Sequence, residues 1–202
     1  MRLTPARSGI SPTFPRMRLG IDLDGVVANF TEGWQRFYNR EFGTALVVED
    51  SQRWNDLVDL THFNDMGEFW EWSSDLDGRS VFWHLDPYPE ALETLHDLAG
   101  MGHRIVVITQ KPDFAIGDTH DWLEHVGVPT EEVHILGIHD GKKWDIDADV
   151  YLDDGPHVLP GLVRYRPDRV VARYVRPWNY PIDGAVDVHD WNDFRELVQR
   201  LP

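Results

Sequence analysis

Short apolar segments alternate with helix-like segments along most of this chain, and this alternation constrains its fold more than any other feature. The apolar segments are residues 18–23, 104–109, 133–136, 149–154 and 169–175. Several of them lack a polar face, which is typical of strands that are buried on both sides in a parallel sheet. Strands and helices in alternation therefore predict an α/β fold with a Rossmann-like, mainly parallel sheet flanked by helices.

The helix-like segments carry their own boundary signals. A helix is predicted over residues 29–43, with Asn29 as its N-cap and Gly43 at its end. Helical spacing of apolar residues predicts three more helices, within residues 85–103, 117–127 and 191–201.

Residues 31–83 interrupt the alternation. This segment is rich in Trp, Asp, Asn and Ser, and it has weak helical patterning with few strand signals. We predict a small, mostly helical module inserted after the first strand, within a core made of residues 17–30 and 84–202. Residues 1–16 contain Pro, Ser and Arg, and their start, MRLTP, is echoed by MRLGI at Met17, so we expect a flexible extension outside the fold.

Composition argues against several classes of protein. The 19 basic and 35 acidic residues give a net charge of −16, which disfavours a nucleic-acid polymer as partner, because affinity for a phosphate backbone comes largely from Lys and Arg. The chain has no cysteine, which excludes disulfides and a cysteine nucleophile. No apolar run is long enough for a signal peptide or a membrane span. We expect a cytoplasmic protein that binds a small molecule and does not bind a membrane. A homodimer is compatible with the sequence.

Three of the predicted strands end in polar residues that can do chemistry. Asp22 and Asp24 follow the first strand, Thr109 ends RIVVIT, and Asp153 and Asp154 end DVYLDD. Because ligands of parallel α/β sheets bind outside the carboxyl ends of the strands, we expect these side chains to share one site. Carboxylates gathered from separate strands suit a hard cation such as Mg²⁺. A D-x-D-G turn taken alone is equally compatible with two solvated aspartates.

Lysine is rare in this chain, and every copy falls near a predicted strand end. The three lysines are Lys111, Lys142 and Lys143. An ammonium group is a point charge that suits a phosphate, and the Thr109 hydroxyl offers a donor for a phosphate oxygen. The alternatives are that the two consecutive lysines belong to a solvated turn and that Thr109 only fills its strand.

The order of these parts resembles the haloacid dehalogenase-like phosphohydrolase superfamily. The four motifs of that superfamily are matched by DLDGV, VVIT, Lys143 and LDD, over nearly all of residues 17–190. A closer resemblance is to the 5′(3′)-deoxyribonucleotidase branch, the cytosolic type C 5′-nucleotidases, in DLDGVVANF, VFWHLDPYPEALETL and KWDIDADVYLDD. Four residues depart from the pattern of that branch: Asn29 stands in place of Asp, Glu90 of Gly, Gln110 of Ser and Lys111 of Pro.

The resemblance implies a phosphatase that works through an aspartyl-phosphate. In this scheme Asp22 is the nucleophile, and Asp24 is the general acid and then the general base. Thr109 and Lys143 hold the phosphoryl oxygens, and Lys142 replaces Lys143 if the register differs by one residue.

The same resemblance implies Mg²⁺ as the cofactor. Its ligands would be the carboxylate of Asp22, the backbone carbonyl of Asp24, and a carboxylate from Asp153 or Asp154. The inserted module would then be a cap over the site.

Aromatic residues of the module are candidates for the substrate pocket. Trp70 and Phe82 are expected to line it and stack on a base, although a small helical module needs most of its rings for its own core. The implied function is Mg²⁺-dependent hydrolysis of a small phosphate ester, with a (deoxy)nucleoside 5′-monophosphate as the leading substrate class. The alternatives are a phosphatase of the same superfamily with a non-nucleotide substrate, and a metal- and phosphate-binding module without turnover.

Overall fold

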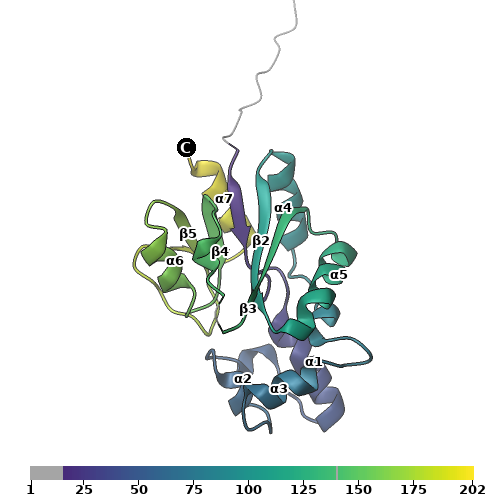
Figure 1. Ribbon diagram of the computed structural model, residues 1–202. Coiled ribbons are helices and arrows are strands. Elements are labelled where there is room, and N and C mark those ends of the chain that lie inside the picture. Colours follow the sequence, from purple (N-terminus) through teal and green to yellow (C-terminus); the bar gives the residue numbers. More distant parts are fainter. Residues whose placement is uncertain (1–15, 140) are drawn as a thin grey trace, which may run out of the picture.

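The computed structural model of the protein describes residues 16–139 and 141–202. Six parallel strands form one sheet in the order β3-β2-β1-β4-β5-β6 (Figure 1). Their bounds are Arg18–Ile21 (β1), Arg104–Lys111 (β2), Thr130–Gly137 (β3), Val150–Asp153 (β4), Val170–Tyr174 (β5) and Val186–Val188 (β6). The predicted α/β fold with a Rossmann-like parallel sheet is confirmed. The extension predicted at residues 1–16 lies, apart from residue 16, outside the described residues.

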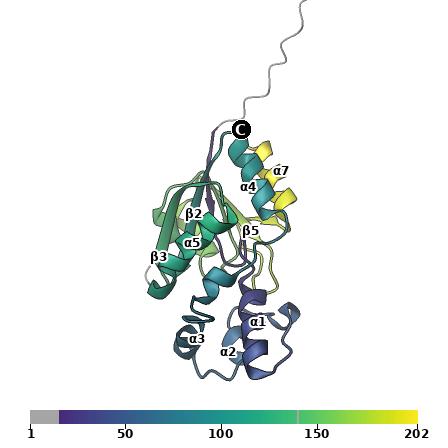
Figure 2. The same cartoon turned by 90° about the vertical axis from the view of Figure 1, so that its right-hand side faces the viewer.

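Helices cover both faces of the sheet. Successive residues of a strand point to opposite sides, so the apolar residues of one strand can pack against helices on both faces. Ile105 and Val107 of β2 belong to the apolar cluster that includes α4 (Ala91–Gly100), α5 (Ile116–Val126) and α7 (Trp191–Arg200). Val106 and Ile108 belong to the cluster that includes α6 (Leu159–Tyr165). Figure 2 shows α4 and α7 side by side on one face.

The helices have the following bounds: α1 Phe30–Phe42, α2 Asp56–Asp59, α3 Met66–Ser73, α4 Ala91–Gly100, α5 Ile116–Val126, α6 Leu159–Tyr165 and α7 Trp191–Arg200. Four short 3-10 helices are η1 Val48–Asp50, η2 Val81–His84, η3 Asp113–Ala115 and η4 Lys143–Asp145. In the described ranges, no helix combines the length and the apolar character that a membrane crossing requires.

Two elements and several strand boundaries differ from the sequence prediction; β3, for example, begins three residues before the predicted start at residue 133. β2 runs two residues past Thr109, because Gln110 and Lys111 still pair with β3. α6 has seven residues, among them Pro160 and Gly161, and therefore shows no clear helical period. β6 has only three residues, two of them exposed, and exists because it pairs with β5 at the edge of the sheet.

The connection between β1 and β2 places helices beyond the carboxyl ends of the strands, where Figure 1 shows α1, α2 and α3 grouped together. Asn29 caps α1 by accepting a hydrogen bond from the backbone N–H of Glu32, and Gly43 ends this helix at φ 66°, both as predicted. Trp34 and Phe69 are buried there and pack edge to face, with ring centres 6.0 Å apart. This group of helices lies in the segment that the sequence analysis assigned to an inserted module.

Candidate functional site

A cluster of three buried carboxylates lies at the carboxyl ends of β1 and β4. These neighbouring strands pair Ile21 with Leu152, so the residues that follow on each strand come to the same edge of the sheet. One carboxylate oxygen from each of Asp22, Asp153 and Asp154 lies within 4.8 Å of the others. Segments about 130 positions apart in sequence thus bring their acidic side chains close together.

The three buried carboxylates outnumber the lysine beside them, so part of their negative charge is uncompensated. Burial, reinforced by the charge of Asp22, raises the pKa of Asp153 to about 6. Burial and the charges of Asp22 and Asp153 raise the pKa of Asp154 well above its usual range. Raised carboxyl pKa values show that ionised oxygens are unfavourable here unless a further cation accompanies them.

Lys143 supplies part of the compensating positive charge. Its Nζ lies 2.8 Å from Asp22 Oδ1 and 2.8 Å from Asp153 Oδ2, and its side chain is 5 % exposed. Burial alone would lower the pKa of Lys143, but the charges of Asp153 and Asp22 outweigh burial and raise it. Lys143 is therefore an ammonium ion held between the two strand ends.

Asp154 offers an oxygen suited to a metal ion. Its Oδ2 accepts a hydrogen bond of 2.8 Å from the indole Nε1 of Trp178, whereas its Oδ1 is buried and finds no partner in the part of the chain that the structure describes. A buried acceptor without a donor requires an explanation. Three carboxylates with one free buried oxygen fit a hard divalent cation, which takes oxygen ligands.

Gly25 permits the close approach of the two acidic loops. Its φ of 77° lies in the left-handed region, and a Cβ at this position would come within 2.1 Å of Asp154 Oδ2. Any side chain here would displace Asp154 as well as strain the backbone.

Asp24 has a cationic partner that the sequence analysis did not assign. Lys111 Nζ lies 2.6 Å from both carboxylate oxygens of Asp24 and 4.0 Å from the ring centre of Phe82. Burial raises the pKa of Asp24 and lowers that of Lys111, and the attraction between the two offsets part of both shifts. The sequence did carry a signal for this contact, because Lys111 lies next to a predicted strand end and stands where the resembled branch has Pro.

The remaining predicted phosphate ligands lie in different surroundings. Thr109 is fully buried, and its Oγ1 has no partner within the described residues. Lys142 is exposed and lines a separate hollow with Trp144 and Tyr165, away from the carboxylates. Of the two consecutive lysines, the structure therefore places Lys143, and not the alternative Lys142, at the site.

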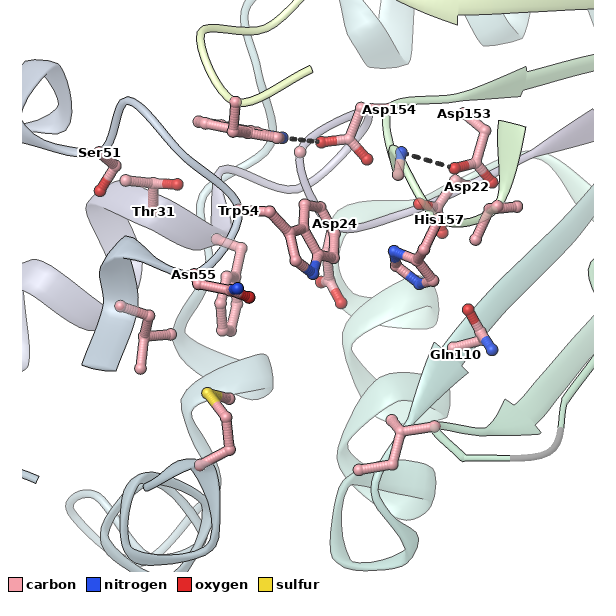
Figure 3. A pocket seen from close by; sticks show the side chains of 18 of the residues that line it. Asp22, Asp24, Thr31, Ser51, Trp54, Asn55, Gln110, Asp153, Asp154 and His157 are labelled. Atoms are coloured by element: carbon pink, nitrogen blue, oxygen red, sulfur yellow. Dashed lines mark hydrogen bonds between the residues drawn. The ribbon is translucent and has the colours of Figure 1, made fainter. Parts of the chain in front are cut away.

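A cavity of about 350 Å³ opens over the carboxylates, between the strand ends and the helices of residues 31–83 (Figure 3). Trp70 and Phe82 line it. Phe82 is 3 % exposed, and its ring stacks on Phe30 with centres 5.6 Å apart, so little of it is free for a ligand.

Trp54 is a lining residue that the sequence analysis missed. Its side chain belongs to the loop before α2, it is 47 % exposed, and its ring centre lies 4.8 Å from that of His157. Figure 3 shows Trp54 and Asn55 across the cavity from Asp153. Burial lowers the pKa of His157, which favours the neutral ring at neutral pH. A planar group that entered this cavity would meet Trp54 on the side of residues 31–83.

Comparisons with known proteins agree with this arrangement. The family model described as 5′ nucleotidase, deoxy (Pyrimidine), cytosolic type C protein matches residues 16–201. The chain is 26% identical over 185 residues to a provisionally named nucleotidase of Oceanobacillus iheyensis, in an alignment that covers 88% of this chain and 97% of that protein.

Solved structures share the fold. A predicted phosphatase from Clostridium acetobutylicum has a TM-score of 0.65 at 13% identity, over 91% of this chain and 98% of that one. A haloacid dehalogenase-like hydrolase of Bacillus subtilis, solved bound to magnesium, has a TM-score of 0.59 at 10% identity, again over 91% and 98%.

Proposed function

The chain belongs to the family of 5′ nucleotidases, deoxy (pyrimidine), cytosolic type C, and we propose that it hydrolyses (deoxy)nucleoside 5′-monophosphates with Mg²⁺ as cofactor. The observation that carries the proposal is the cluster of Asp22, Asp153, Asp154 and Lys143 under a cavity with aromatic walls. The family and the fold support a phosphatase. We propose the metal, the substrate class and the roles of the residues.

Asp22 acts as the nucleophile in this proposal. A carboxylate oxygen of Asp22 forms a bond to phosphorus while the bond from phosphorus to the ester oxygen breaks, which leaves an aspartyl-phosphate. Asp24 gives its proton to the departing oxygen, so the product leaves as an alcohol. Burial raises the pKa of Asp24, which favours the protonated form that this step needs.

The second half of the reaction returns the site to its starting state. Asp24, now ionised, takes a proton from a water molecule, whose oxygen attacks phosphorus and displaces Asp22. Inorganic phosphate leaves, Asp22 is a carboxylate again, and Asp24 has regained its proton. Splitting the displacement in two lets one pair of carboxylates serve both steps.

Cationic and polar groups stabilise the phosphoryl oxygens. Lys143, already an ammonium ion between Asp22 and Asp153, offers positive charge next to the nucleophile. The buried hydroxyl of Thr109, which has no partner among the described residues, is the further donor in this proposal. Mg²⁺, when bound by Asp22, the Asp24 carbonyl and Asp153 or Asp154, would supply further positive charge to the same oxygens.

The cavity supports a nucleotide as the substrate. Its volume of about 350 Å³ falls within the range of small-ligand pockets. Trp54 is the most exposed aromatic group of the wall, and base-aromatic stacking contributes about 1–3 kcal/mol per base. We further propose that residues 31–83 act as a cap that brings Trp54 and Trp70 over the substrate, and that the protein works in the cytoplasm as its composition suggests.

Phosphate release from a panel of esters tests the proposal. Deoxynucleoside 5′-monophosphates should be hydrolysed in Mg²⁺ and not in excess EDTA, and sugar phosphates without a base should be poorer substrates. Equal rates with ribose 5-phosphate would favour a phosphatase for non-nucleotide esters. Metal binding without turnover of any ester would favour a binding module.

A variant of the cavity wall tests the base contact separately. Trp54→Ala should raise KM for deoxynucleotides by about tenfold, the equivalent of 1.4 kcal/mol of lost stacking. Its kcat/KM for ribose 5-phosphate should stay unchanged, because that substrate has no base. Equal losses for both substrates would remove Trp54 from base recognition.

A further inference from the structure

The connection between β5 and β6 reaches across to the carboxylate cluster. Trp178 donates its indole N–H to Asp154 Oδ2 at 2.8 Å, and the side-chain amide of Asn179 donates to the backbone carbonyl of Asp154 at 2.9 Å. Arg176 Nε donates to the carbonyl of Gly25 at 2.7 Å. One short segment therefore holds both the end of β4 and the turn that follows Asp22.

This segment, residues 176–179, is itself firmly anchored. Asn179 uses its full hydrogen-bonding capacity, since it also donates to the carbonyl of Tyr174 and accepts from Arg173 and from the backbone N–H of Arg176. The guanidinium carbon of Arg176 lies 4.0 Å from the ring centre of Tyr88 and 4.4 Å from that of Tyr174.

The anchoring continues into the sheet. Arg173, a buried residue of β5, forms two hydrogen bonds of 2.8 and 2.6 Å to Asp187 of β6. The indole of Trp178 therefore reaches Asp154 from a segment that is anchored to two neighbouring strands, β5 and β6.

The consequence for Asp154 is a carboxylate with one fixed orientation. The indole N–H occupies Oδ2, and the other oxygen, Oδ1, is the buried one without a donor in the described chain. This oxygen belongs to the carboxylate that, with Asp22 and Asp153, forms the compact cluster. A small cation needs such fixed ligands, because Mg²⁺ requires near-ideal octahedral geometry at short distances, whereas Ca²⁺ accepts longer and less regular contacts.

We propose that residues 176–179 are a positioning arm for Asp154, and that the indole N–H of Trp178 gives the site its preference for Mg²⁺ over Ca²⁺. This inference rests on the metal site of the proposed function and takes Asp154, of the two alternatives there, as the ligand. Groups that orient metal ligands commonly change metal affinity by about 10- to 100-fold when they are removed. Trp178 acts here through Asp154 and is a positioning residue.

Calorimetric titration of the full chain with MgCl₂ and with CaCl₂ tests the proposal. Trp178→Phe keeps an aromatic ring in the cavity wall and removes the donor. Its Kd for Mg²⁺ should rise by at least about tenfold, and its Kd for Ca²⁺ by less than about threefold, so that the preference for Mg²⁺ falls. Trp54→Phe is the matched control, because Trp54 lines the same cavity and, within residues 16–139 and 141–202, donates to no carboxylate; the Mg²⁺ affinity of this variant should not change.

Two further measurements keep the test decisive. Circular dichroism in EDTA shows whether Trp178→Phe is folded. If it is not, Asn179→Ser is the second variant: it removes the amide that donates to the Asp154 carbonyl, and it should also lower the affinity for Mg²⁺. An Mg²⁺ affinity within about twofold of the native value in a folded variant would overturn the positioning role. An equal loss for both cations would overturn the role in selectivity.

Failure of this proposal is distinguishable from failure of the proposed function. Native protein that binds Mg²⁺ but turns over no ester contradicts the phosphatase mechanism and leaves the arm testable by titration. Native protein that hydrolyses nucleotides while Trp178→Phe keeps its cation preference contradicts only the arm. Native protein that does not bind Mg²⁺ overturns the arm outright.

Discussion

The two ends of the parallel sheet carry charge in opposite ways. At the amino ends of the strands, acidic and basic side chains are partly exposed and paired: Arg18 with Glu132 at 3.0 Å, and Arg169 with Asp149 at 2.7 Å. At the carboxyl ends, the carboxylates of Asp22, Asp153 and Asp154 are buried and outnumber the lysine that reaches them, Lys143.

The pKa values follow the same division. At the amino end, a hydrogen bond from Arg18, with a second from His134, lowers the pKa of Glu132 to about 2. At the carboxyl end, burial raises the pKa of Asp153 to about 6. Paired surface charges contribute modestly to folding, whereas buried like charges oppose it unless a ligand compensates for them. One end of the sheet is therefore built for stability, and the other for binding a cation and an anion together.

The largest expected contrast is in activity. Asp22→Asn removes the proposed nucleophile and should lower kcat by at least about 1,000-fold, while circular dichroism stays native. The matched control is Asp147→Asn at the amino end, where Asp147 meets Arg166 and Arg169 on the surface; its kcat should equal that of the native protein. Retained activity in Asp22→Asn would remove Asp22 from the mechanism.

The next contrast is in the response to metal. At 100 times its Kd, Mg²⁺ should stabilise the native protein by about 2.7 kcal/mol, or about 5–10 °C in Tm for a chain of this length. Asp154→Asn should abolish that gain. In EDTA, however, the same variant should melt above the native protein, because burial and two neighbouring carboxylates make the ionised form of Asp154 unfavourable.

Neutralising one of three neighbouring carboxylates removes like-charge repulsion, and differential scanning calorimetry in EDTA can detect this gain. Asp149→Asn at the amino end is the control, since it loses its pair with Arg169 and should keep the full response to Mg²⁺. If metal-free Asp154→Asn melts below the native protein, the carboxylates at the carboxyl end do not destabilise the fold in the absence of metal, and this prediction is wrong.

Backbone strain also lies at the carboxyl end. Glu90, which precedes α4, has φ 66°, and Asp77 is the only other non-glycine residue with positive φ among those described. Left-handed backbone costs an ordinary residue about 1–2 kcal/mol, and glycine avoids that cost. Glu90→Gly should therefore raise the free energy of unfolding by about 1 kcal/mol in denaturant titrations. Glu93→Gly, inside α4, is the matched control and should lower it by about 1 kcal/mol.

The smallest expected effect is at the amino end. The folded pKa of Glu132 is about 2, below the unfolded value of about 4.3. Its contribution to stability is thus present above the unfolded pKa and is lost as pH falls from about 4.3 toward 2. Glu132→Gln should lower Tm slightly at pH 7, by the equivalent of less than about 1 kcal/mol for an exposed pair. The difference from the native protein should vanish near pH 2 in a series of thermal melts, and a difference that persisted there would assign it to another interaction.

The sequence by itself determined the sheet and the place of the site. Apolar runs and helix caps act over a few residues, so the parallel α/β fold, the N-cap at Asn29 and the end of α1 at Gly43 could be predicted locally. Carboxyl ends of parallel strands meet at one edge, which is why Asp22, Asp153 and Asp154 could be expected together before their contact was known. The short elements α6 and β6 escaped prediction because their residues form no measurable period.

Only the tertiary structure decided which side chains complete the site. Lys142 and Lys143 are consecutive and chemically alike, but η4 buries Lys143 against Asp22 and leaves Lys142 exposed. Lys111 meets Asp24 from 87 positions away, and Trp178 meets Asp154 from 24. Such contacts depend on strand register and on the paths of loops, which follow from the packing of the whole chain and are not encoded in any local pattern.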